Sequence, residues 1–316
     1  SVLNSDLDTL ERFYAIEGVL EAELMLEEVA LGEDELTAHL LIGVFEGERW
    51  TVSDISFDGP EAVPVDSLRA ATSLRAGRPY RVDAADRDRT RNVDAYVERS
   101  YLDTRVFQNI ERDDDARAAS IHYRVHEGPR ARIDSIRVIG DEKTREFVVR
   151  RQLTFEPGEL FDSEKIGLSQ ANIYRTGLFS SVWIEPAEAD TGEPLKTAVV
   201  RVREIPSGVF EVQLGYAVHD GVEARGGVTN RNVQGQAINL SGDVRLAEFS
   251  RGVEASVRDP WFLGVPVAMD GNASYEWNNE EAYKAESSQG GFFLTKSFGR
   301  AVTVESGYEF VRTVVL

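Results

Sequence analysis

The spacing of hydrophobic positions changes once along the chain, near Ser207. Before that point, segments with apolar residues at helical spacing, such as Val93, Tyr96 and Val97, stand between segments in which apolar and polar residues alternate. The first spacing is typical of an amphipathic helix and the second of a half-buried strand. After Ser207 only the alternating pattern continues. The pattern therefore predicts an α+β part over 1–206 and an all-β part over 207–316.

The α+β part contains an internal repeat, and such a repeat indicates a string of similar small domains. Glu46, Glu127 and Glu204 lie at the ends of its three copies, 81 and 77 residues apart. The aligned ends of the second predicted helix are Gly18, Ser100 and Gly177.

Each complete copy has the same predicted order of elements, β-α-α-β-β. A first strand is followed by a short helix, and a second helix begins after Asp83 or Asp162, both good N-cap residues. That helix ends at the aligned Gly or Ser, where Gly177 suits a left-handed backbone. Two strands complete the copy, so that two helices cover one face of a small sheet. These closing strands are 104–111 with 119–126, and 180–186 with 195–204.

The repeat predicts the domain boundaries. Residues 1–49 contain only the second helix and the last two strands, so they are interpreted as a truncated copy. Complete copies are expected over 50–128 and 129–206, with the all-β part over 207–316. Because the chain starts at Ser and stops within a strand pattern, we interpret it as an internal piece of a longer protein.

The all-β part is predicted to hold seven strands of roughly 9–11 residues, the length that crosses a bilayer at a tilt. One face is apolar, the other carries many charges, and aromatic residues lie near strand ends, as membrane interfaces favour. A barrel satisfies the backbone hydrogen bonds of a membrane sheet only when it is closed, so further strands are expected. A soluble β-sandwich shows the same alternation and is the alternative.

Charge and composition narrow the possible functions. The chain has 35 Lys plus Arg against 55 Asp plus Glu, a net charge of −20, which disfavours a nucleic-acid partner. It has no Cys, which excludes disulfides and thiolate catalysis. His122 and His126 are four residues apart on a predicted strand, a weak metal signal, and no nucleophile motif appears. We therefore expect neither enzymatic activity nor a metal or cofactor.

Four segments carry a resemblance to a known family: VHEGPR (125–130), GLFSSVWIE (177–185), LGYAVHDGVEARGGVTNRNVQGQ (214–236) and RDPWFLG (258–264). The repeat copies resemble POTRA domains, and the strands after them resemble the start of the barrel in the BamA/TamA outer-membrane assembly family. The last two segments are the more specific. They contain the family's Asn-x-x-Gly turn and its Asp-Pro-aromatic-Phe turn, here Asn232, Gly235, Asp259, Pro260, Trp261 and Phe262.

The resemblance implies a role in inserting β-barrel proteins into a bacterial outer membrane, without ATP or covalent chemistry and with the POTRA domains in the periplasm. The implied partners are unfolded outer-membrane protein clients, the lipid bilayer, and accessory proteins of the periplasm or inner membrane. An unpaired strand edge can template a new strand through its backbone hydrogen bonds. The expected client-binding edges are Val106, Phe107 and Ile110, and Ser181, Val182, Trp183 and Ile184; the expected barrel seam is Val209, Glu211, Gln213 and Gly215.

Other functions remain open at this stage. A two-partner secretion transporter has the same architecture, and a lipase-like enzyme can use POTRA domains and a barrel as its anchor. A soluble adhesion or scaffolding module with a β-sandwich tail is the alternative from another class. Three visible POTRA copies are compatible with both the BamA and the TamA subfamilies.

Overall fold

The computed structural model describes residues 2–31, 38–217, 221–279, 284–299 and 301–315. Residues 218–220, which belong to the family-like segment 214–236, lie outside the described residues. The chain divides into two compact units. The first contains residues 1–134, 158–164 and 188–196, and the second contains 135–157, 165–187 and 197–316.

The N-terminal elements of the first unit are a helix and a hairpin, followed by one complete repeat copy, here called the middle copy. Helix α1 (Val2–Ile16) precedes the antiparallel pair β1 (Glu23–Leu31) and β2 (Ala38–Phe45). The middle copy consists of β3 (Thr51–Asp58), α2 (Val65–Ala71), α3 (Val82–Val97), β4 (Arg105–Asp113) and β5 (Ala118–His126). Its sheet has the order β3-β5-β4, in which β3 is parallel and β4 antiparallel to β5.

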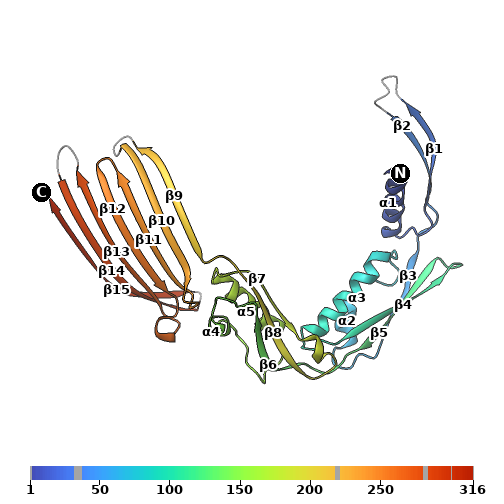
Figure 1. Ribbon diagram of the computed structural model, residues 1–316. Helices are drawn as coiled ribbons and strands as arrows, with labels where there is room; N and C mark the ends of the chain where they lie inside the picture. Colours follow the sequence, from blue (N-terminus) through green and yellow to red (C-terminus); the bar gives the residue numbers. More distant parts are fainter. Residues whose placement is uncertain (1, 32–37, 218–220, 280–283, 300, 316) are drawn as a thin grey trace. The chain divides into compact units, whose positions relative to one another are not determined.

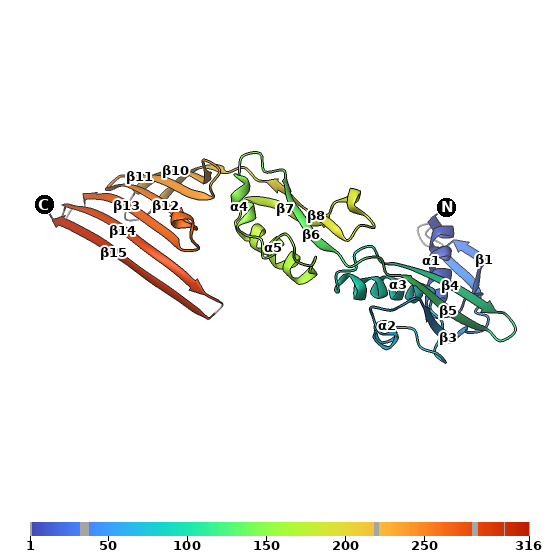
Figure 2. The same cartoon turned by 90° about the horizontal axis from the view of Figure 1, so that it is seen from below.

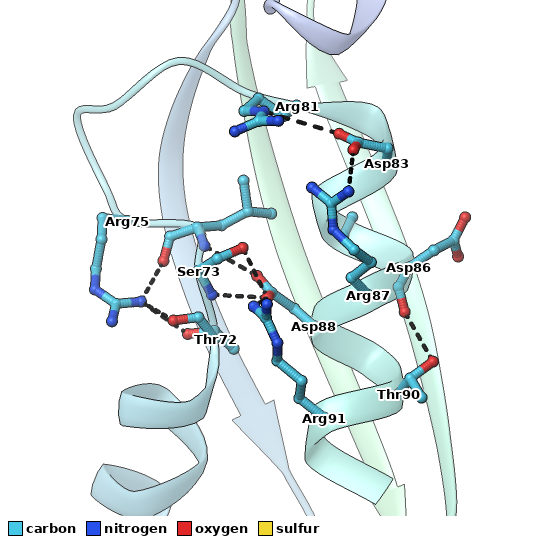
Figure 3. A network of polar contacts seen from close by, with 12 residues as sticks. Thr72, Ser73, Arg75, Arg81, Asp83, Asp86, Arg87, Asp88, Thr90 and Arg91 are labelled. Carbon is cyan, nitrogen blue, oxygen red and sulfur yellow. Dashed lines mark hydrogen bonds and ion pairs between the residues drawn. The ribbon is translucent and has the colours of Figure 1, made fainter. Parts of the chain in front are cut away.

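The core of the middle copy lies between this sheet and its two helices, which Figure 1 shows on one side of the strands. Tyr80, Tyr96 and Tyr123 are fully buried there together with Ile121. Asp88 on α3 is also fully buried, and its carboxylate accepts hydrogen bonds from the Ser73 and Leu74 amides (2.7 and 2.9 Å; Figure 3). A buried carboxylate thus fixes the loop between α2 and α3.

The last copy follows with the same order of elements: β6 (Arg132–Ile139), α4 (Glu146–Arg150), α5 (Ser163–Arg175), β7 (Phe179–Pro186) and β8 (Leu195–Glu204). A short 3₁₀ turn, η1 (Glu188–Asp190), lies between β7 and β8. The sheet order is β6-β8-β7, which matches the middle copy. At the place of Asp88, Ser169 is buried and accepts from the Thr154 amide (2.9 Å), so the same loop is held by a different polar group.

The local geometry confirms the alignment of the copies. Gly18, Ser100 and Gly177 all adopt left-handed backbone angles (φ +91°, +70° and +69°) just after their helices. Asp162 caps α5, since its carboxylate accepts from the Glu164 amide (2.8 Å). The corresponding N-cap prediction for Asp83 is wrong: α3 starts at Val82 with Arg81 as its cap residue. Asp83 lies in the first turn instead, where a negative charge still favours the helix.

The second unit ends in one seven-stranded antiparallel sheet, as predicted. Its strands pair in chain order, so the sheet is a meander from β9 to β15, and Figures 1 and 2 show it as a single layer. The strands are β9 (Gly208–Ala217), β10 (Gly221–Val233), β11 (Ile238–Ala247), β12 (Ser250–Asp259), β13 (Ala268–Asn279), β14 (Lys284–Phe298) and β15 (Val302–Val315), with a 3₁₀ turn η2 (Phe262–Gly264) after β12. Four of them, β10, β13, β14 and β15, have 12 to 15 residues and are longer than predicted.

The cross-strand pairing shows which residues of this sheet share a face, one face being apolar and the other polar. The apolar face carries Phe210, Leu214 and Tyr216 of β9, which are 75–81% exposed, and the cross-strand partners of these residues. The opposite, polar face carries residues such as Arg225, Arg245 and Glu276. Among the described residues, the buried apolar side chains from this sheet and its turns are only Ala237 and Ala285. A β-sandwich would bury one face of the sheet, so this arrangement favours the barrel interpretation.

Candidate functional site

The predicted client-binding strands β4 and β7 are both edge strands of their three-stranded sheets. Each pairs on one side only among the described strands, β4 with β5 and β7 with β8. The backbone groups on the other side of such a strand are therefore open to a further strand.

The residues predicted to bind clients divide between the two faces of these strands. Val106 and Ile184 are buried in the domain cores, so their side chains are not available to a client. Phe107 and Trp183 point outward and are 54% and 62% exposed. Ile110, Ser181 and Val182 are half-buried. The alternation of a strand explains this division, because successive side chains point to opposite faces.

The predicted barrel seam, β9, lies at one edge of the seven-stranded sheet and pairs with β10 alone among the described strands. Its register is regular over ten residue pairs, from Gly208 opposite Asn230 to Ala217 opposite Gly221. Glu211, Gln213 and Gly215, like Val209, belong to the polar face. The other edge of β9 is a continuous row of backbone donors and acceptors, with large apolar side chains on one face.

The Asn-x-x-Gly turn after β10 packs against the last copy. Asn232 is buried; its amide donates to the Thr144 hydroxyl (2.9 Å) and its amide oxygen accepts from the Ala237 backbone (2.8 Å). Gly235 accepts from the Arg145 amide (2.8 Å). A Cβ at Gly235 would collide with the Lys143 carbonyl, and its φ of +74° disfavours other residues. The turn thus needs Gly both for its conformation and for this close approach.

Thr144 itself is held by Glu204, the Glu that ends the last copy. The Glu204 carboxylate accepts from the Lys143 and Thr144 amides (3.1 and 2.7 Å). Glu127 has the same role in the middle copy, where it accepts from the Glu61 and Ala62 amides (2.6 and 2.7 Å). Sequence reasoning aligned these Glu residues but assigned them no role. Their recurrence at the repeat spacing was the available signal.

The Asp-Pro-aromatic-Phe turn contributes a second contact with the last copy. The guanidinium of Arg151 lies 5.0 Å from the ring centre of Trp261 and 5.5 Å from that of Phe147, a cation–π arrangement. Asp259 accepts from the Trp261 amide (2.9 Å), which fixes the turn. Phe262 meets Phe292 of β14 edge to face. Burial lowers the pKa of Arg151, but an arginine remains protonated at neutral pH.

A buried ion pair occurs in the first unit. Lys196, 1% exposed, places its ammonium 2.7 Å from the Asp103 carboxylate and 2.7 Å from the Asp190 carbonyl. The Gly192 amide donates to the same Asp103 oxygen (2.9 Å). Asp103 precedes β4, whereas Gly192 and Lys196 belong to the last copy, so the two copies are joined here by charge.

The remaining candidate residues have structural partners. His122 is hydrogen-bonded to the Ser56 hydroxyl (2.8 Å), and His126 packs edge to face against Phe107. Within the described ranges, no three His, Asp or Glu side chains are grouped so that they could hold a metal ion. The helices in these ranges are too short or too polar for any of them to span a membrane.

The comparisons with known proteins agree with this architecture. The POTRA family, described as "Surface antigen variable number repeat", matches residues 50–128 and 131–204. Outer membrane protein assembly factor BamA from Neorickettsia risticii is 23% identical over 97% of this chain and 41% of its own length. BamA from Buchnera aphidicola is 22% identical over 83% of this chain and 42% of its own length. The chain therefore spans about two fifths of the curated relatives it matches.

A solved structure shows the same fold. BamA from Haemophilus ducreyi lacking POTRA domains 1–3 superposes with a TM-score of 0.70, at 19% identity, over 84% of this chain and 52% of that chain. The expectation that this chain is not an enzyme agrees with the BamA relatives, which are described as assembly factors. Repeat copies, sheet topology and relatives lead to one conclusion: the chain contains POTRA domains over 50–128 and 131–204, followed by a seven-stranded sheet, and it is similar over most of its length to outer membrane protein assembly factor BamA.

Proposed function

We propose that this chain is the part of an outer-membrane assembly factor that receives unfolded β-barrel clients on its POTRA edges and templates their strands at β9. The POTRA domains then lie in the periplasm and the seven-stranded sheet lies in the bacterial outer membrane. The observation that carries this proposal is the edge of β9, which pairs with β10 alone among the described strands and is continuous with the apolar face.

The physical reason is the cost of unpaired backbone groups in lipid. A hydrocarbon environment offers no partner for an N–H or C=O group, so an open edge there is costly. A client strand that adds to β9 satisfies the backbone groups of the β9 edge and of one of its own two edges. Phe210, Leu214 and Tyr216 continue the lipid-facing surface up to this edge, so a client strand paired with β9 extends that surface.

The POTRA edges suit an earlier step, in which a client is still in water. An extended client segment can add beside β4 or β7 by backbone hydrogen bonding, which is independent of its sequence. Phe107 and Trp183 offer an exposed aromatic surface for apolar client side chains on the outer faces of these strands. The buried Val106 and Ile184 hold the edges in place from within.

A disulfide-trapping experiment tests templating at β9. Gln213→Cys in the full-length protein is expected to crosslink to a Cys in the terminal strand of an arrested client. Gln289→Cys is the matched control, because Gln289 is on the same polar face but lies in β14, which is paired on both sides. Absence of a crosslink at Gln213, or an equal yield at Gln289, would contradict the proposal.

A photo-crosslinking amino acid tests the POTRA step separately. Placed at Trp183 on β7, it is expected to capture clients during assembly. Tyr174 on α5 is the matched control, because it is an aromatic residue of the same domain with similar exposure (60% against 62%) but is away from the edge. Equal capture at both positions would indicate nonspecific contact and contradict a role for the β7 edge.

A further inference from the structure

Four arginines line one cavity at the contact between the last POTRA domain and the sheet. The cavity has a volume of about 570 Å³, and Arg151, Arg175, Arg231 and Arg258 contribute to its wall. No Asp or Glu is among its lining residues, although acidic residues outnumber basic ones 55 to 35 in the chain. A group of four cations in an acidic protein is therefore a specific feature of this place.

The charges of this cavity are only partly neutralised by nearby carboxylates. Arg258 pairs with Asp270 at 3.2 Å, and Asp259 lies close enough to Arg151 to interact with its charge. Arg175 donates to the Asn172 side chain and to the Ala171 carbonyl, which are neutral acceptors. The Arg231 side chain makes no hydrogen bond or ion pair with the described residues. Four positive charges thus face two negative ones.

Two buried polar atoms of the lining residues also lack partners. They are Nε of Arg151, a donor, and Oδ1 of Asn239, an acceptor, and both are shielded from solvent without a hydrogen bond in the described structure. A buried polar atom without a partner is unfavourable, so a ligand that pairs with both atoms gains from binding. The two atoms require complementary groups, an anionic acceptor for Arg151 and an N–H donor for Asn239.

The strand register identifies the side from which a ligand arrives. On β12, Arg258 alternates with Val257 of the apolar face, and on β11, Asn239 alternates with Leu240. Arg231 lies at the register shift between Asn230 and Val233, where the alternation of β10 is interrupted. Arg258 and Asn239, which are opposite one another, therefore place the cavity on the polar face of the sheet. A membrane lipid contacts the opposite face, so the occupant comes from the aqueous side of the sheet.

We propose that this cavity binds a carboxylate-bearing segment of polypeptide, with the arginines holding its acidic side chains and Asn239 accepting a backbone N–H. A peptide supplies the anion and the N–H donor together. The indole of Trp261 and the ring of Pro260 supply an apolar wall for the adjoining residues. The site extends the proposed function, because it would select acidic client segments at the periplasmic mouth of the barrel. The inference depends on the proposed function in one respect, namely that the bound peptide belongs to a client.

Fluorescence anisotropy on the full-length protein in detergent micelles tests the site. The probe is a fluorescein-labelled pentapeptide with three Glu residues, compared with the same peptide in which Gln replaces each Glu. We expect the Glu peptide to bind at least about fivefold more tightly than the Gln peptide, and Arg231→Gln to remove most of this difference. Arg231→Lys, which keeps the charge, is expected to retain most of it and also reports that the protein is folded.

Arg225→Gln is the matched control, because Arg225 is an arginine of the same strand β10, six residues earlier and outside the cavity. Equal binding of the two peptides, an effect of Arg231→Gln below twofold, or an equal effect of Arg225→Gln would overturn the site. Displacement of the Glu peptide by inorganic phosphate at equal concentration would identify a simple anion site and overturn the peptide assignment. The Gln213 crosslink is measured separately, so failure of templating at β9 and failure of this cavity are distinguishable.

Discussion

The buried pair between Lys196 and Asp103 gives the sharpest prediction about stability. Lys196→Met keeps the length of the side chain but removes the ammonium, which is 1% exposed and contacts both the Asp103 carboxylate and the Asp190 carbonyl at 2.7 Å. Asp103 then keeps the Gly192 amide as a partner, and 15% of its side chain is exposed. Breaking a fully buried pair costs about 3–5 kcal/mol, so we expect about 2 kcal/mol here.

Hydrogen exchange followed by mass spectrometry on the full-length protein measures this cost locally. A loss of about 2 kcal/mol corresponds to roughly 30-fold faster exchange in the segment 188–196, whose Gly192 amide donates to Asp103. Arg201→Met is the matched control, because Arg201 is on the same strand β8 but its pair with Glu185 is more than half exposed. Such a surface pair contributes about 0–1 kcal/mol.

A second substitution separates charge from packing. Adding Asp103→Asn to Lys196→Met removes the uncompensated carboxylate and is expected to restore at least half of the lost protection. If exchange of 188–196 in Lys196→Met stays within threefold of the Arg201→Met control, the pair does not hold the two copies together. If the double variant is no better protected than the single one, the loss arises from packing and the electrostatic reasoning is wrong.

Three further predictions concern the polar contacts of the POTRA domains and of the turn after β10. Asp88→Ala is expected to lower the free energy of unfolding of the middle copy by about 3 kcal/mol, as measured by urea denaturation, because the Ser73 and Leu74 amides lose their buried acceptor. The control is Arg91→Ala, because Arg91 forms an ion pair with Asp88 but its own side chain is about half exposed. Gly235→Val is expected to speed hydrogen exchange at Arg145. Gly226→Val in β10, the strand that leads into this turn, is expected to leave it unchanged, because a Cβ there meets no atom within 4 Å. Burial raises the pKa of Glu127, but hydrogen bonds from the Glu61 and Ala62 amides and from the Tyr96 hydroxyl outweigh it, so its pKa is lowered. This stabilisation is present above the unfolded pKa of about 4.3 and is lost as the pH falls. The destabilisation caused by Glu127→Gln is therefore expected to be largest near neutral pH and to shrink in acid, as followed by urea denaturation at several pH values; an effect independent of pH would contradict this assignment.

Local pattern determined much of this architecture. The eighty-residue repeat, the order of its elements and the seven alternating strands are all visible in the sequence, because helix and strand periodicities depend on neighbouring residues. The aligned positions of Gly18, Ser100 and Gly177 also follow from local requirements, since each ends a helix with a left-handed residue. The start of α3 was misplaced because both Arg81 and Asp83 lie near its first turn, and a cap depends on detailed geometry rather than on residue type alone.

Contacts between distant segments decided the rest. Asn232 and Thr144 are 88 residues apart, and Lys196 and Asp103 are 93 apart, so no local pattern indicates that they meet. The sequence located the Asn-x-x-Gly turn, but only the fold shows that this turn seats on the last POTRA domain. In the same way, Arg151, Arg175, Arg231 and Arg258 are scattered over more than one hundred residues and become one cationic cavity only when helix ends and strand ends are brought together. Periodicity determines on which face of its own helix or strand a side chain lies, whereas tertiary packing determines which residues of other elements it contacts.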